Sequence, residues 1–119
     1  MKAVDLPDQF DIARARLAHT KAKFMPVYSL DAAAEFENES LDFVYIDANH
    51  SLPWIMDDLC AWYPKVRKGG VVSGHDYHAM NNSVHVKYAV DAFTQAYKIQ
   101  PWFVLGDRYH SWLFEKAGE

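Results

Sequence analysis

Apolar residues recur at helical spacing in four stretches of the chain. Ser29 and Ser51 are well placed to cap two of these stretches, and Asp31 lies in the first turn after Ser29. Asp57 and Asp58 are expected to face water on the polar side of the third stretch. The pattern predicts helices over residues 10–17, 30–36, 52–63 and 86–97.

Runs of β-branched and aromatic residues alternate with these helices. The run 41–46 ends at Asp47 and is typical of a buried parallel strand, whereas Pro26 restricts the run 23–28 to a sheet edge or a strand end. The last two runs are joined by residues 106–110, which favours an antiparallel hairpin. The expected strands are 23–28, 41–46, 71–73, 102–105 and 111–115.

Strands that alternate with helices indicate an α/β fold with a mostly parallel sheet, to which the final hairpin adds an antiparallel edge. With 119 residues, half of them hydrophobic, the chain is expected to form one domain, 1–119. Its net charge of −4 argues against a broad nucleic-acid-binding surface. From Asp31 to Trp62 there are eight acidic residues and no lysine or arginine, which indicates either a solvated face or a field that attracts a cation.

Cys60 is the only cysteine, so no internal disulfide can form and a reducing, cytoplasmic location is expected. No apolar run approaches the ~20 residues of a membrane span, and the N-terminus lacks the pattern of a signal peptide. These features favour a protein that acts on a small-molecule substrate and has neither nucleic acid nor membrane as a partner.

Polar side chains follow three of the expected strands. Ser29 follows the first strand, Asp47 and His50 follow the second, and Asp76 follows the third. Ligands of open α/β sheets bind beyond the carboxyl ends of the strands. Because one helix connects the second and third strands, these strands should be neighbours, and Asp47 and Asp76 should meet at one edge of the sheet.

Two neighbouring carboxylates need a cation or a shared proton. Oxygen ligands suit Mg²⁺, Ca²⁺ or Mn²⁺, whereas nearby histidines such as His75 and His78 would instead admit Zn²⁺ or Fe²⁺. His50, at the turn into a helix, is placed to serve as a general base. In the alternative interpretation each aspartate only forms a cap or turn, and His50 hydrogen-bonds the loop backbone.

Aromatic residues outside the strand ends are interpreted as structural. The indoles of Trp54, Trp62 and Trp102 are expected in the core rather than against a ligand. Tyr109 and His110, in the hairpin connection, are expected to be exposed connectors.

Three blocks of the sequence resemble class I S-adenosylmethionine-dependent methyltransferases. The block Ser-Leu-Asp-Phe-Val-Tyr-Ile-Asp-Ala-Asn-His at 40–50 is similar to the fourth strand and following loop of that family. Residues 58–70 resemble the helix and turn before the fifth strand, and Gly-His-Asp-Tyr at 74–77 resembles the end of that strand. The resemblance covers roughly residues 10–116 and points to small bacterial methyltransferases related to sugar and natural-product O-methyltransferases.

The resemblance implies a Rossmann-like, three-layer fold and O-methylation of a small hydroxylated substrate. Asp47 and Asp76 match positions that bind a divalent cation such as Mg²⁺ in the metal-dependent members, where the cation holds two substrate oxygens and lowers the pKa of the one to be methylated. His50 matches a catalytic base. Ser29 and Leu30 match a loop on the adenine side of the cofactor S-adenosylmethionine, and the resemblance also assigns Asp47 to catalysis and to cofactor binding.

The chain also departs from the family pattern. The family begins with two strands and a glycine-rich loop that holds the cofactor, but no glycine precedes Gly69 here. The chain is therefore expected to be an N-terminally truncated domain that lacks the first two strands and binds S-adenosylmethionine poorly unless a partner completes it. Tyr77 replaces the family's second metal carboxylate or asparagine. The strand at 23–28 is expected to pair either beside 41–46 or with a second copy, and a homodimer through the exposed sheet edge is predicted.

Two rival functions stay open besides O-methylation. One is a non-catalytic binding or assembly module that reuses the half-fold. The other is a metal-dependent enzyme of different chemistry that uses Asp47, His50, His75 and Asp76.

Overall fold

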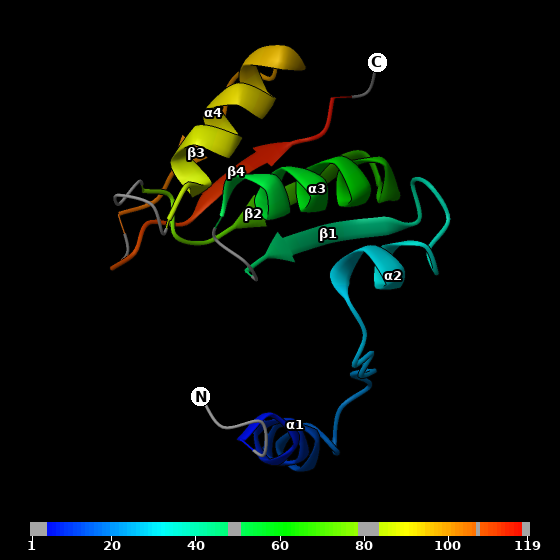
Figure 1. Ribbon diagram of the computed structural model, residues 1–119. Coiled ribbons are helices and arrows are strands. Elements are labelled where there is room, and N and C mark those ends of the chain that lie inside the picture. Colours follow the sequence, from blue (N-terminus) through cyan, green and yellow to red (C-terminus); the bar gives the residue numbers. More distant parts are fainter. Residues whose placement is uncertain (1–4, 48–50, 79–83, 107, 118–119) are drawn as a thin grey trace.

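The computed structural model describes residues 5–47, 51–78, 84–106 and 108–117. Two helices precede a region in which strands and helices alternate (Figure 1). In chain order the elements are α1 (Asp5–Arg16), α2 (Ser29–Ala33), β1 (Leu41–Ile46), α3 (Leu52–Trp62), the 3₁₀ turn η1 (Tyr63–Lys65), β2 (Val66–Gly74), α4 (Val86–Ala96), β3 (Phe103–Val104) and β4 (Trp112–Glu115).

The strands form one sheet in the order β1-β2-β4-β3. β1 and β2 are parallel and are joined through α3, whereas β4 runs antiparallel to both β2 and β3. Parallel neighbours need a crossover connection, and α3 supplies it on one face of the sheet. The expected α/β, Rossmann-like fold with a parallel start and a C-terminal antiparallel hairpin is confirmed.

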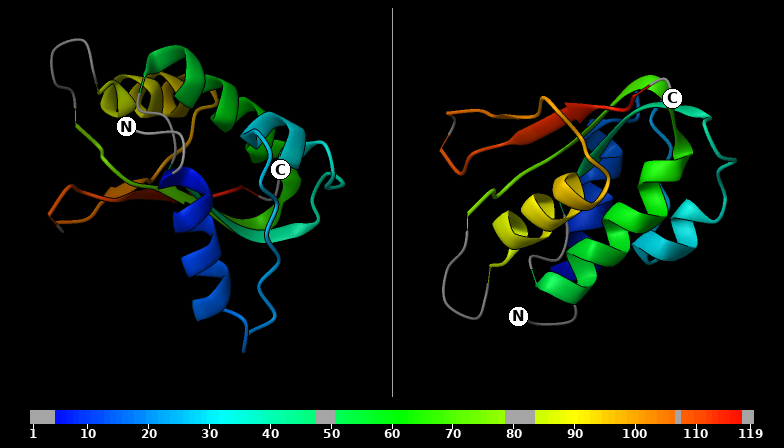
Figure 2. Two further views of the ribbon diagram at one scale, coloured as in Figure 1. Left: turned by 60° about the horizontal axis from the view of Figure 1, so that its bottom comes forward. Right: turned by 90° about the horizontal axis from the view of Figure 1, so that it is seen from above.

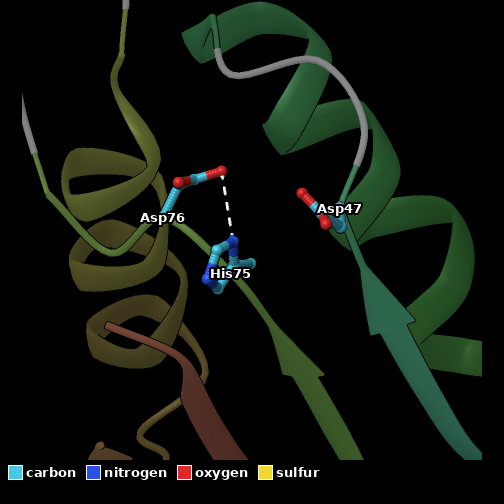
Figure 3. A group of neighbouring side chains, drawn as sticks. All are labelled: Asp47, His75 and Asp76. Atoms are coloured by element: carbon cyan, nitrogen blue, oxygen red, sulfur yellow. Dashed lines mark ion pairs between the residues drawn. The ribbon is translucent and has the colours of Figure 1, made fainter. Parts of the chain in front are cut away.

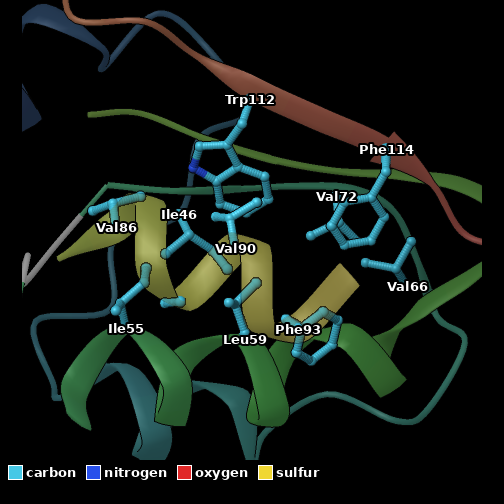
Figure 4. Close-up of a cluster of buried hydrophobic side chains, with 11 residues drawn as sticks. Ile46, Ile55, Leu59, Val66, Val72, Val86, Val90, Phe93, Trp112 and Phe114 are labelled. Carbon is cyan, nitrogen blue, oxygen red and sulfur yellow. The ribbon is translucent and has the colours of Figure 1, made fainter. Parts of the chain in front are cut away.

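Helices α3 and α4 lie side by side on one face of the sheet, and their apolar stripes form the core with the strands (Figure 2). Figure 4 shows Trp112 and Phe114 of β4 directed toward α4. The apolar stripe predicted for α4 is part of the core, as expected. None of the described helices is long and apolar enough to cross a membrane. The core residues are Ile46, Ile55, Leu59, Val66, Val72, Val86, Ala89, Val90, Phe93, Trp112 and Phe114.

The opposite face of the sheet carries exposed aromatic residues at β1. Because side chains alternate across a strand, Val44 and Ile46 face the helices, and Phe43 and Tyr45 face the other way. The side chains of Phe43 and Tyr45 are 55% and 46% exposed, and their rings stack with centroids 6.5 Å apart. β1 is also an edge strand of the described sheet, so an apolar surface adjoins an open backbone edge.

The prediction of a strand at residues 23–28 is wrong. In the described part of the chain no strand precedes β1, and residues 23–28 form an irregular link between α1 and α2 that stands clear of the sheet (Figure 1). A strand needs a neighbour with which to exchange backbone hydrogen bonds, and Pro26 has no N–H to offer. Pairing of this segment beside β1 is thus excluded in the described chain, whereas pairing with a second copy stays a prediction.

Two helix starts differ from the expectation. α1 begins at Asp5, five residues before the first apolar position of its expected stripe. Ser29 lies inside α2 and Tyr28 occupies the capping position, so the predicted capping role of Ser29 is wrong. The Ser29 hydroxyl instead accepts a hydrogen bond from the indole N–H of Trp62, at 2.7 Å. A long-range contact with α3 has replaced the local cap.

Candidate functional site

Asp47, His75 and Asp76 converge at the carboxyl ends of β1 and β2 (Figure 3). One potential ligand atom from each of the three residues lies within 4.8 Å of the others. Asp47 is exposed, whereas the side chains of His75 and Asp76 are 25% and 15% exposed. The structure therefore brings the two predicted carboxylates together and adds the imidazole of His75 beside them.

The register of the parallel pair explains this convergence. Ile46 of β1 pairs with Gly74 of β2, so the residues that follow, Asp47 and His75, leave the sheet at the same level. The backbone N–H of His75 donates to the carbonyl oxygen of Ile46 at 3.3 Å and extends the ladder by one bond. Asp76 then adopts a positive φ of 60°, a left-handed conformation that aspartate tolerates better than most residues.

The three side chains fit a divalent cation. Oxygen and nitrogen ligands about 2.1 Å from one ion lie at most about 4.2 Å apart, close to the spacing of the group around Asp47. Two carboxylates and one imidazole form a mixed donor set of the kind that divalent cations use in proteins.

Tyr77, which stands where the resemblance places a second metal carboxylate, faces away from this group. Its hydroxyl donates to Asp91 Oδ1 at 2.6 Å, and its ring meets Trp102 edge to face. Burial raises the pKa of the Tyr77 phenol, and its hydrogen bond to Asp91 adds to the shift. Lys87 completes the cluster with an ion pair to Asp91 at 2.8 Å. Tyr77 thus anchors the chain after β2 to α4.

Other histidines of the chain have different surroundings. His78 Nε2 lies 3.7 Å from Asp76 Oδ1 but is not part of the converging group. His85 Nδ1 accepts a hydrogen bond from the backbone N–H of Leu52 at 3.0 Å, which satisfies one of the first amides of α3. His50, the predicted base, lies outside the described residues.

Tyr109 lies closer to the candidate site than the sequence suggested. It is 47% exposed, as a connector should be, but its ring centroid lies 6.1 Å from that of His75 and 6.3 Å from that of His78. The antiparallel pairing of β2 with β4 explains the proximity, because the turn before β4 must lie at the carboxyl end of β2. The hairpin predicted from the sequence was a signal that could have indicated this position of Tyr109.

A cavity of about 600 Å³ opens between the first turn of α2 and the N-terminal half of α3. Ser29 and Leu30, the predicted cofactor residues, line it together with Trp54. The expectation that Trp54 belongs to the core is wrong, since its side chain is 56% exposed. Trp62 and Trp102 do pack against the core, as expected. A volume of this size is within the usual range for small-molecule sites.

Asp58, at the wall of this cavity, is buried rather than turned to water as expected. It is 6% exposed, and this burial raises the pKa of its carboxyl above the usual range. A hydrogen bond from the Ser29 hydroxyl opposes the shift, and the negative charge of neighbouring Asp57 adds to it. Asp57 itself is exposed. Trp62, Ser29 and Asp58 therefore form a continuous hydrogen-bonded link between α2 and α3.

Comparison with known proteins relates the chain to a family. A family model described as a methyltransferase domain matches residues 3–77, more than half of the chain. The crystal structure of a Corynebacterium glutamicum protein superposes with a TM-score of 0.64 at 20% sequence identity, covering 90% of this chain and 54% of that one. The chain thus spans about half the length of the matched protein, and the likeness shows a shared fold. No curated protein matches the chain.

Proposed function

The chain belongs to the class I S-adenosylmethionine-dependent methyltransferase family, and on this premise we propose that it takes part in methyl transfer from S-adenosylmethionine to a hydroxyl oxygen of a small substrate. The observation that carries the proposal is the convergence of Asp47 and Asp76 at the carboxyl edge of the sheet. Ligands of α/β sheets bind at this edge. The cavity lined by Ser29 and Leu30 lies between α2 and α3, the helix that follows β1.

Asp47 and Asp76 are proposed to hold a divalent cation. When bound, such a cation coordinates substrate oxygens and lowers the pKa of the hydroxyl to be methylated. The two carboxylates follow the ends of neighbouring paired strands, so the sheet holds their backbones close together before any ligand arrives. The role proposed for this pair is to orient the acceptor oxygen toward the methyl group, since positioning contributes most of the barrier reduction in such a displacement.

The cavity between α2 and α3 is proposed to hold the adenine side of the cofactor. Ser29 and Leu30 line one wall, and the indole of Trp54 offers an exposed aromatic surface on the other. A flat heteroaromatic ring gains about 1 kcal/mol from stacking on such a surface. Asp47, which follows β1 directly, is proposed to flank the cofactor as well as the cation.

The base that removes the hydroxyl proton is proposed to be His50. As the methyl–sulfur bond breaks and the methyl–oxygen bond forms, that proton has to leave the acceptor oxygen. An imidazole titrates near neutral pH and is suited to receive it. His50 follows Asp47 by three positions in the sequence and precedes Ser51, the capping residue of α3.

Isothermal calorimetry with S-adenosylmethionine tests the cofactor half of this proposal. The wild-type chain is expected to bind weakly, with Kd of about 10⁻⁴ M. Trp54→Ala should weaken binding about fivefold to tenfold through loss of the stacking surface. Tyr88→Ala is the matched control, because Tyr88 is equally exposed at 55% and lies on α4, outside the cavity.

Two results would contradict the cofactor assignment. If Trp54→Ala and wild type bound S-adenosylmethionine with equal affinity, the cavity would not be the cofactor site. Absence of heat from the wild-type chain at millimolar cofactor would favour the rival function, a non-catalytic assembly module that keeps the fold without the chemistry.

A further inference from the structure

We propose that His75 is a third protein ligand of the cation site and that the site therefore prefers a later transition ion such as Co²⁺ or Zn²⁺ to Mg²⁺. The inference rests on the proposed role of Asp47 and Asp76 as cation ligands. It goes beyond that role because it names the residue that selects the ion.

Backbone geometry places His75 for this role. The parallel ladder sets Gly74 opposite Ile46, and the N–H of His75 donates to the carbonyl oxygen of Ile46 at 3.3 Å. His75 is therefore held at the level of Asp47, one residue beyond the last ladder pair. Figure 3 shows its imidazole just beyond the end of β2, on the same side of the strand ends as Asp76 and Asp47, with Nδ1 3.5 Å from Asp76 Oδ2.

The donor set determines which ion fits. Mg²⁺ prefers oxygen ligands, whereas imidazole nitrogen suits the later divalent ions of the first transition row. The residue after Asp76 offers no carboxylate, because Tyr77 points its hydroxyl to Asp91 on α4. Among the described residues, the group of acidic, histidine and cysteine side chains that converges here consists of Asp47, His75 and Asp76. One of the three donors is thus a nitrogen.

Three protein ligands leave room for the substrate. Catalytic metal sites keep at least one coordination position for the reacting molecule. Asp47 is exposed and the other two side chains are partly exposed, so solvent reaches the space between them. A substrate with two neighbouring oxygens is the class that suits such a site, because both oxygens bind the same ion.

Metal titration of the purified full chain tests the inference. Metal-free protein is titrated with Co²⁺ and with Mg²⁺, and binding is followed by calorimetry and, for Co²⁺, by its visible absorption. Wild type is expected to bind Co²⁺ at least about tenfold more tightly than Mg²⁺. His75→Ala should weaken Co²⁺ binding about tenfold or more and leave Mg²⁺ binding within about threefold.

Three further variants separate His75 from its surroundings. His75→Asp restores an all-oxygen donor set and should shift the preference toward Mg²⁺. His78→Ala is the matched control, because His78 also approaches Asp76, at 3.7 Å, but lies outside the converging group. Asp47→Asn should weaken binding of both ions, and circular dichroism checks that each variant is folded.

The outcomes distinguish this inference from the proposal on which it rests. Co²⁺ affinity unchanged by His75→Ala, together with loss in Asp47→Asn, would overturn the role of His75 and leave the carboxylate site standing. No binding of either ion by the wild type, or binding indifferent to Asp47→Asn, would overturn both. Calorimetry with S-adenosylmethionine is read separately and does not depend on the metal.

Discussion

At the residue scale, the most consequential side chain outside the candidate cation site is Asp58. Its carboxyl is buried against the Ser29 hydroxyl at the wall of the proposed cofactor cavity. Burial in a poorly solvated site disfavours the charged form, which is why the pKa of Asp58 is raised. An ionised Asp58 therefore opposes folding at neutral pH, and the hydrogen bond from Ser29 offsets part of that cost.

The raised pKa of Asp58 predicts a pH-dependent effect on stability. A carboxyl whose pKa is higher in the folded state favours folding while protonated, so its contribution is present below 3.8 and is lost as pH rises through the raised value. Asp58→Asn keeps an acceptor for Ser29 and removes the charge. Its thermal unfolding temperature should exceed that of wild type at pH 7 and approach it at pH 4.

The adjacent residue supplies the control for this measurement. Asp57→Asn removes the same charge from an exposed neighbour and should raise the unfolding temperature at pH 7 much less than Asp58→Asn does, because Asp57 is the smallest of the causes of the Asp58 pKa shift. An Asp58→Asn variant that is less stable than wild type at pH 7 would contradict the assigned cause, because it would show that the ionised carboxylate stabilises the fold.

At the element scale, the end of β2 positions the candidate site, and Gly74 makes that end possible. A Cβ atom at Gly74 would meet the carbonyl oxygen of Ile46 at 2.6 Å and the indole ring of Trp112. The absence of a side chain therefore lets β1, β2 and β4 approach closely where the parallel ladder ends. This close packing fixes the end of β2, and thereby the positions of His75 and Asp76, which follow it.

Gly74→Ala should destabilise the protein and disturb the site together. Forcing a methyl group against backbone and a buried indole costs about 1 to 3 kcal/mol, which urea unfolding measures. Co²⁺ affinity should fall as well, because His75 and Asp76 must shift with the strand. Gly106→Ala is the matched control, since a Cβ there meets no atom within 4 Å. Equal stability of the two variants would contradict this account of β2.

At the scale of the whole molecule, the sheet is open at β1. In the described sheet the outer edge of β1 has no neighbouring strand, and Phe43 and Tyr45 of β1 are exposed. Unpaired strand edges with apolar neighbours pair readily with another chain. An antiparallel contact between two β1 strands is self-complementary, as a two-fold dimer requires. We propose that the chain forms a homodimer through this edge.

Light scattering at high protein concentration measures this association. The wild-type chain is expected to show a dimer mass, and Tyr45→Lys should shift the population toward monomer by placing a charge in the contact. Tyr88→Lys alters another exposed tyrosine, on α4, and should leave the mass unchanged. A monomer mass for wild type at all concentrations would refute the dimer.

Much of the fold follows from local pattern, for a physical reason. The stripes in α3 and α4 and the apolar run in β1 are periodic because each element buries one face, so their positions could be read from the chain. The carboxylates Asp47 and Asp76 could be placed at strand ends for the same reason. The strand expected at 23–28 failed because strand formation depends on a partner that local pattern does not contain.

The tertiary structure alone decided which side chains come into contact. The sequence determined that Asp47 and Asp76 end neighbouring strands, but register set His75 level with Asp47 and turned Tyr77 toward α4. Burial of Asp58 depends on where α2 packs against α3, a contact between segments far apart along the chain. Such contacts depend on distances in space rather than on spacing in sequence, and the candidate site is composed of them.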